Sequence, residues 1–253
     1  MYSMDMAELM YIIGTLLILP AIIFALVAQF KVQGAFNRYS QTPSSKGLTG
    51  AQLARRMLDD NGCSHVQVEH TRGHLSDHYD PRKRVIRLSD SVYNSTSLAA
   101  IGVAAHEVGH AIQHQNKYVP LMLRQLVIKS TSLINKLLMP LIIVGLIASI
   151  FVTGATVLGM KTETFFFVLV ICFCAIYMIS FVINLITLPT EYNASARAKR
   201  LLRQGNYLFD DEEYRAVSKV LGAAALTYLA ALLVSFAYML RFLGLLLQMA
   251  RRR

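Results

Sequence analysis

Long apolar stretches alternate with polar segments along the chain. No charged residue occurs in four stretches, at residues 10–30, 137–160, 164–188 and 220–240. Each has about 20 residues or more, which as a helix is long enough to cross a hydrocarbon core of about 30 Å. We therefore predict four membrane spans, at residues 8–30, 137–160, 163–188 and 220–247, the last of which either crosses the membrane or lies against it.

The first apolar stretch predicts an anchor that stays in the protein. It is longer than the apolar core of a secretory signal peptide, and the residues before it include Asp5 and Glu8 but no Lys or Arg. Because a signal peptide begins with a basic segment, we favour an uncleaved membrane span.

The segment between the first two spans (31–136) begins with a polar stretch and a short helix. Residues 31–45 are polar and include Pro43, which indicates a linker. Thr49 is a candidate N-cap for a helix that stops near Asn61 and Gly62.

Two strands and a second helix follow in the same segment. Alternating apolar positions predict strands at 65–70 and 84–88, and the turn residues between them predict that 74–79 pairs with 84–88 as a hairpin. Residues 95–97 offer caps for a helix that ends before Pro120. This order predicts a small α+β domain of about 100 residues on one face of the membrane.

Composition and charge support a multi-pass membrane protein. Hydrophobic residues make up 55% of the chain and charged residues 16%, which is too apolar for a soluble domain of this length. Of the 25 Lys and Arg residues, fourteen lie in 31–136, six in 197–219 and one between the second and third spans. Because positive residues favour the cytoplasmic side, we expect 31–136 and 189–219 to be cytoplasmic segments of an inner (plasma) membrane protein. Since these basic residues follow the ends of the spans, the net charge of +10 does not indicate a nucleic-acid partner.

The helix before Pro120 carries the residues Ala105-His106-Glu107-Val108-Gly109-His110. His106 and His110 share one helix face, where both imidazoles can bind a single metal ion. Glu107 lies beside the open coordination position and can act on a water molecule there. Chance alone would produce such a pattern roughly 0.005 times in this chain. We predict a hydrolytic Zn²⁺ site with Glu107 as its catalytic residue.

A catalytic zinc site needs a third protein ligand. Thr190 is a candidate N-cap that places Glu191 in the first turn of a helix within 189–219. Spans two and three form a hairpin that returns the chain to the face of the motif helix, so Glu191 can meet His106 and His110. We expect Glu191 to be the third ligand; the alternative is that it only interacts with the dipole of its own helix.

Five other histidines compete for that position: His65, His70, His74, His78 and His114. His114 lies eight residues after His106, which turns its side chain about 80° away on the helical wheel. The remaining four fall on predicted strand and loop, where histidines are more often solvated or shape a groove. We expect none of the five to be a primary ligand.

The layout resembles that of a known family. An N-terminal span, the segment Ser76–Arg82, the motif continued to Gln113, a membrane hairpin and the segment Leu188–Ser195 are similar to the YugP-like zinc metallopeptidases of bacterial membranes. More distantly, they resemble gluzincin membrane proteases. The resemblance implies a mainly α-helical, multi-span fold with a small α+β gluzincin-like zinc peptidase domain.

The resemblance also implies roles for individual residues. His106, His110 and Glu191 correspond to zinc ligands, and Glu107 corresponds to the catalytic base. Many gluzincins have Asp four residues after the third ligand, where this chain has Ser195. A neutral hydroxyl can orient an imidazole but raises its basicity less than a carboxylate does.

We therefore expect a zinc-dependent endopeptidase that hydrolyses peptide bonds in membrane-associated or membrane-proximal proteins. An outer edge of the 74–88 hairpin can bind an extended peptide, and by analogy His78, Tyr79 or Arg82 stabilises the oxyanion. The alternative is a zinc-binding membrane scaffold without proteolysis. A transporter is disfavoured because the spans contain almost no ionisable groups, with Asn184 as their main strongly polar residue.

Overall fold

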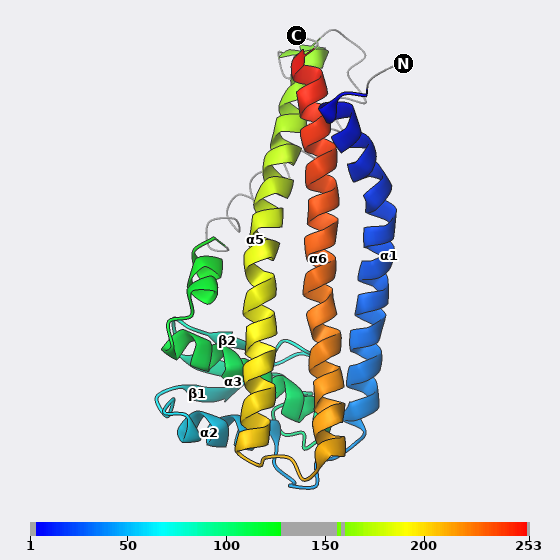
Figure 1. The fold of residues 1–253 in the computed structure, drawn as a ribbon. Helices are drawn as coiled ribbons and strands as arrows, with labels where there is room; N and C mark the ends of the chain where they lie inside the picture. The colour runs from blue at the N-terminus through cyan, green and yellow to red at the C-terminus, as the bar shows by residue number, and fades with distance from the viewer. Residues whose placement is uncertain (1–3, 128–155, 158–159, 252–253) are drawn as a thin grey trace. The chain divides into compact units, whose positions relative to one another are not determined.

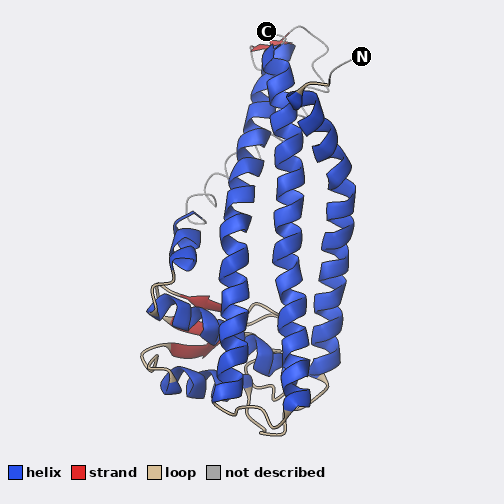
Figure 2. Ribbon diagram, viewed as in Figure 1, coloured by secondary structure: helices blue, strands red, loops and turns tan. Residues whose placement is uncertain are grey.

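The computed structural model describes residues 4–127, 156–157 and 160–251 and is mainly helical, with a small three-stranded sheet (Figures 1 and 2). Its elements are α1 (Met6–Ser40), α2 (Gly50–Asp60), β1 (Gln67–His70), β2 (His78–Asp80), β3 (Val85–Leu88), α3 (Leu98–Gln115), β4 (Thr156–Val157), β5 (Met160–Lys161), α5 (Thr162–Gln204) and α6 (Asp211–Arg251). The chain forms two compact units. The helical unit comprises Met1–Ala25, Leu123–Leu185 and Ala230–Arg253, and the α+β unit comprises Leu26–Met122 and Ile186–Leu229.

Three helices are long and apolar enough to cross a membrane: Met6–Ser40, Thr164–Gln204 and Asp211–Arg251. They contain three of the four predicted spans. The fourth, 137–160, lies outside the described residues except for its last few positions. There Thr156–Val157 and Met160 belong to the strands β4 and β5 and not to a helix.

Close helix packing and two internal hydrogen bonds hold the helical unit together. A Cβ on Gly14 of α1 would lie 2.4 Å from the backbone nitrogen of Arg241 in α6, so glycine permits the two backbones to approach. Between α5 and α6, the amide of Asn184 donates to Ser235 Oγ over 3.1 Å and to the carbonyl of Ala231. Asn184 thus has partners on the neighbouring helix, which is consistent with a packing role.

Helix α1 continues to Ser40, so the expected linker at 31–45 is wrong for its first ten residues. Tertiary packing extends the helix: Phe36 is buried against Ala99 and Val220 in the α+β unit. The polar residues of this stretch are compatible with helix, and Pro43 comes only after the helix has ended.

The α+β unit follows the predicted order of helix, strands and helix (Figure 2). Thr49 caps α2 in a capping box with Gln52, and Ser97 caps α3, as the sequence predicts. The sheet order is β1-β3-β2, with β1 parallel to β3 and β2 antiparallel to it, which confirms the hairpin. Buried residues of α2, α3, β3 and the adjoining parts of α5 and α6 share one core, which fixes α3 in place.

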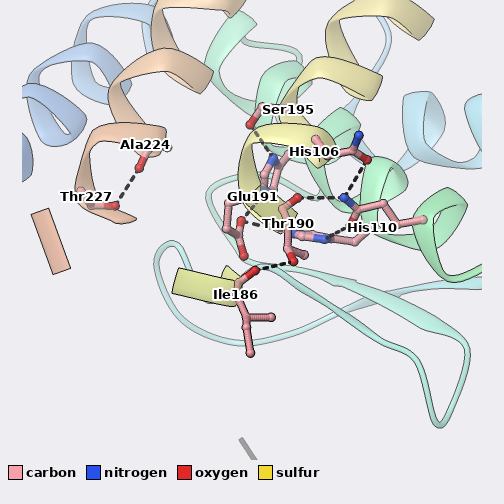
Figure 3. Close-up of polar contacts among 10 residues, drawn as sticks. His106, His110, Ile186, Thr190, Glu191, Ser195, Ala224 and Thr227 are labelled. Carbon is pink, nitrogen blue, oxygen red and sulfur yellow. Dashed lines mark hydrogen bonds and ion pairs between the residues drawn. The ribbon is translucent and has the colours of Figure 1, made fainter. Parts of the chain in front are cut away.

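Helix α5 runs without interruption through Pro189, so the prediction that Thr190 begins a new helix is wrong. A proline inside a helix removes one backbone donor and crowds the carbonyl four residues before it, yet α5 is helical on both sides of Pro189. Thr190 instead donates its hydroxyl to the carbonyl of Ile186 over 3.0 Å (Figure 3). Glu191 is therefore an interior residue of a long helix. An interaction with the dipole at the N-terminus of its own helix cannot account for a carboxylate at this position.

Candidate metal centre

Helices α3 and α5 lie in close contact at the histidine motif. A Cβ on Gly109 would lie 2.5 Å from the carbonyl oxygen of Ala194, a separation that real Cβ atoms do not show. Glycine between the two histidines therefore lets the backbone of α3 lie directly on α5. Because Glu191 precedes Ala194 by one helical turn, this contact brings its carboxylate to the histidine face of α3.

The side chains of His106, His110 and Glu191 point toward one another (Figure 3). The Oε2 atom of Glu191 lies 3.1 Å from Nε2 of His106 and 3.4 Å from Nε2 of His110. All three candidate ligand atoms lie within 4.8 Å of one another. The structure thus brings together the three residues that the sequence pattern selects. They come from two helices, and His110 and Glu191 are 81 positions apart in the chain.

This set of donors fits zinc. Zinc binds imidazole nitrogen and carboxylate oxygen at about 2.0–2.2 Å in tetrahedral geometry, which places neighbouring ligand atoms about 3.3 Å apart. The two nitrogen-to-oxygen distances above agree with that spacing. Three protein ligands also leave a fourth position open, as catalytic zinc sites require.

Ser195 contacts the opposite side of the His106 ring. Its hydroxyl oxygen lies 3.1 Å from Nδ1 of His106, while Nε2 of the same ring faces Glu191 (Figure 3). Ser195 is buried and lies four residues after Glu191 on α5. The expectation that this hydroxyl orients a ligand histidine therefore agrees with the contact.

The other imidazole has a partner that the sequence analysis missed. Nδ1 of His110 lies 3.0 Å from Oε1 of Gln113, a fully buried residue of the same helix. The signal that could have identified Gln113 is its spacing: a polar side chain three positions after a candidate ligand lies on the same side of the helix.

Glu107 is buried, with 7% of its surface exposed. Burial raises the pKa of its carboxyl from 4.5 to about 7, and the nearby carboxylates of Glu191 and Asp77 act in the same direction. The electrostatic interaction with His106 and a hydrogen bond from the backbone N–H of Tyr79 oppose this rise. A carboxyl group with a pKa near neutrality can both accept and return a proton at physiological pH.

His114 belongs to a separate pair. The hydroxyl of Tyr79 lies within hydrogen-bonding distance, 2.8 Å, of Nδ1 of His114, which joins β2 to α3. Burial raises the pKa of Tyr79 to about 12, which keeps its hydroxyl protonated. Burial also lowers the pKa of His114, and the nearby charge of Arg84 adds to the effect. Both effects disfavour the charged form of the His114 imidazole.

The remaining histidines are placed on the sheet and its loops. His70 pairs with Asp90 over 2.6 Å, and the ring of His78 donates from Nδ1 to the carbonyl of Ser76 over 2.9 Å. His74 packs edge-on against Phe36. Within the described part of the chain, the cluster of metal-ligating side chains contains His106, His110 and Glu191 and none of the other histidines. Arg82, a further candidate for the oxyanion, is exposed in the turn after β2.

Comparison with known proteins places these residues in context. The profile of a family described as "Putative neutral zinc metallopeptidase" matches residues 14–247. The chain is also similar to a protein described as "Putative membrane protease YugP" from Bacillus subtilis (strain 168), with 44% identity over 222 residues, which is 87% of this chain and 90% of the relative. No solved structure matches the chain. The family description names zinc, the metal that the donor set fits.

Proposed function

The chain belongs to the neutral zinc metallopeptidase family, and on this premise we propose that it is a membrane-embedded zinc endopeptidase with a gluzincin-like centre. Its substrates are peptide bonds in membrane-associated or membrane-proximal proteins. The observation that carries the proposal is the convergence of His106, His110 and Glu191 beside the buried carboxyl of Glu107. A site that only stores or holds zinc has no need of that fourth, acid–base group.

Each residue of the centre has a distinct task in peptide hydrolysis. His106 and His110 hold the metal through Nε2, and Glu191 holds it through a carboxylate oxygen. When bound, zinc supplies a Lewis acid that polarises the scissile carbonyl and acidifies water. Glu107 takes a proton from the attacking water on its carboxylate and delivers that proton to the amine that leaves.

The sheet offers a place for the peptide substrate. Strand β2 is an outer strand, and no other strand among the described residues pairs with its far side. The backbone N–H of Tyr79 in β2 reaches the carboxylate of Glu107. An extended peptide that adds to this edge by main-chain hydrogen bonds therefore lies close to the catalytic base.

Replacing Glu107 by Gln tests the proposal. We expect Glu107→Gln to abolish cleavage while zinc stays bound, because the variant loses the base and retains the ligands. The measurement compares membrane and cytoplasmic peptides of cells that carry wild type or the variant, together with the zinc content of both purified proteins. Glu213→Gln, which neutralises another buried carboxylate of the α+β unit, is the matched control and should retain cleavage. Equal peptide profiles in wild type and Glu107→Gln, with zinc bound in both, would instead support the scaffold.

We place the centre on the cytoplasmic side, close to the membrane surface. Glu191 follows the apolar stretch 164–188 within three residues, and the positive-inside distribution favours the cytoplasm for both polar segments. In a variant without the native cysteines, Lys46→Cys should react with a membrane-impermeant thiol reagent only after permeabilisation. Lys161→Cys should react in intact cells. The reverse labelling pattern would place the centre outside the cytoplasm.

A further inference from the structure

Gln113 joins the metal centre to helix α5 through three hydrogen bonds of its side-chain amide. Its amide oxygen lies 3.0 Å from Nδ1 of His110. Its amide nitrogen donates to the carbonyl of Thr190 over 2.8 Å and to Oδ1 of Asn193 over 3.0 Å. The side chain is fully buried, so water does not replace these partners. Only one of the two possible orientations of the Gln113 amide satisfies these three contacts.

Two groups that cannot change their roles determine that orientation. A backbone carbonyl such as that of Thr190 can only accept a hydrogen bond. A guanidinium can only donate, and Nε of Arg197 lies 2.8 Å from Oδ1 of Asn193, so Asn193 must present its oxygen there. Gln113 therefore has to direct its NH₂ group toward Thr190 and Asn193. Its oxygen is left facing His110.

The orientation of Gln113 in turn selects one tautomer of His110. A neutral imidazole carries its proton on one nitrogen and a lone pair on the other. Because the amide oxygen can only accept, Nδ1 of His110 must be the protonated nitrogen. In the neutral imidazole the lone pair then belongs to Nε2, the atom that lies 3.4 Å from Glu191 in the candidate metal centre. This is the form in which His110 can bind a metal through Nε2.

We propose that Gln113 is a positioning residue that fixes the tautomer and ring orientation of His110 for zinc, and that Thr190, Asn193 and Arg197 hold its amide in the required direction. The inference rests on the proposed function for its biological purpose. His106 differs, because its partner is the hydroxyl of Ser195, which can either donate or accept and therefore does not select a tautomer. Of the two imidazole ligands, His110 is thus the one whose Nδ1 proton is fixed by a protein group in the absence of metal.

The test uses two substitutions that differ in one respect. Gln113→Leu and Gln113→Glu both remove the amide donors that bridge α3 to α5. Only Gln113→Glu keeps an oxygen that can accept the proton of Nδ1. We expect Gln113→Leu to weaken zinc binding by about 10–100-fold. Gln113→Glu should bind zinc more tightly than Gln113→Leu, because its carboxyl, when protonated, can donate to the carbonyl of Thr190 and still accept the proton of Nδ1 with its other oxygen. The affinity of the full-length protein in detergent is measured by competition between zinc and a chelator, with Gln115→Leu on the same helix as the control that should bind zinc normally.

A spectroscopic readout separates positioning from simple packing. In the metal-free protein labelled with ¹⁵N-histidine, Nδ1 of His110 should be protonated in wild type and in Gln113→Glu. A mixture of tautomers should replace this signature in Gln113→Leu. If both variants lose zinc affinity equally, or if the tautomer stays the same in Gln113→Leu, the inference is overturned. Should Gln113→Leu fail to fold, a folded Gln113→Glu protein with more than tenfold weaker zinc binding overturns it as well.

These readouts do not depend on proteolysis. An inactive wild-type protein with the expected zinc affinities would contradict the proposed function and leave the positioning role of Gln113 supported. If the wild-type protein is active and Gln113→Leu binds zinc normally, the proposed function is supported and the positioning role of Gln113 is contradicted.

Discussion

Gly109 of α3 lies so close to Ala194 of α5 that a Cβ at position 109 would stand 2.5 Å from the Ala194 carbonyl oxygen. This contact is a property of the histidine motif itself, because Gly109 occupies the position just before the second histidine. Two histidines on one helix need a third ligand from another part of the chain. Because Gly109 has no side chain, the helix that carries Glu191 can approach the two histidines. The metal centre therefore depends on backbone packing as much as on its ligands.

We predict that Gly109→Ala separates the two helices and damages the zinc site. The added methyl group meets backbone atoms, which cannot move away as a flexible side chain can. Overpacking of this kind costs about 1–3 kcal/mol, and a small shift of α5 moves Glu191 away from His106. Thermal unfolding and zinc competition on the purified variant should show lower stability together with weaker zinc binding.

Gly222→Ala is the matched control for this prediction. Gly222 is also helical and lies in the α+β unit, and among the described residues no atom of a neighbouring element lies within 4 Å of the place that a Cβ would take. Alanine there should leave zinc binding unchanged and slightly stabilise the helix, by about 0.5–1 kcal/mol. Equal effects of the two substitutions would show that close packing at Gly109 does not support the centre.

Zinc should stabilise the folded protein through Glu191. A ligand that binds only the native state adds about 2.7 kcal/mol when its free concentration is 100 times its dissociation constant. We therefore expect zinc to raise the melting temperature of the chelator-treated wild type. Glu191→Gln should lose most of that shift, because the amide is a poorer ligand, while Glu213→Gln should keep it. A full zinc-induced shift in Glu191→Gln would remove Glu191 from the ligand set.

Ser195 should affect zinc binding through His106. We expect Ser195→Ala to weaken zinc binding by about tenfold, at the lower end of the range for outer partners of metal ligands, because a neutral hydroxyl supports the imidazole only weakly. Ser195→Asp should bind zinc more tightly than Ser195→Ala, since a carboxylate makes the imidazole more basic. Ser44→Ala, which removes another buried hydroxyl of the α+β unit, provides the control. Chelator competition that ranks Ser195→Ala equal to wild type would contradict the role of this contact.

Local sequence patterns predict the elements of the α+β unit well, because the deciding interactions are short-range. Thr49 and Ser97 are caps whose side chains bond to backbone three residues away. The turn before β3 is likewise local, and the apolar stretches identify three long helices without any tertiary information. The ligands His106 and His110 are also found locally, since helical periodicity alone places them on one face.

The errors arise where tertiary contacts override local signals. Burial of Phe36 extends α1 through a polar stretch, and a continuous α5 absorbs Pro189 where the local pattern suggested a new helix. The spacing of Gln113 from His110 is a local signal, but the partners that orient its amide lie about 80 positions away on α5, and no local pattern reveals them. Glu191 could be selected only by combining the chemistry of a third ligand with the expected return of the chain from a membrane hairpin.

Burial of Glu107 predicts a pH dependence of the metal-free protein. Its pKa is about 7 in the folded protein against an ordinary value of 4.5, so the folded protein holds this proton more tightly than the unfolded chain does. The resulting stability is fully present below about pH 4.5 and is lost as the pH rises to about 7, by up to about 3 kcal/mol. Glu107→Gln has no ionisable group at position 107 and should therefore not lose this stability between about pH 4.5 and 7.

Unfolding of the chelator-treated wild type and Glu107→Gln should therefore be followed in parallel between pH 4.5 and 8. We expect the two proteins to be similarly stable at the acidic end and the variant to become progressively more stable than wild type toward pH 7, with the difference constant above that. A stability difference that does not change with pH would mean that Glu107 ionises as an exposed carboxyl does, and its assignment as a buried proton acceptor would then be wrong.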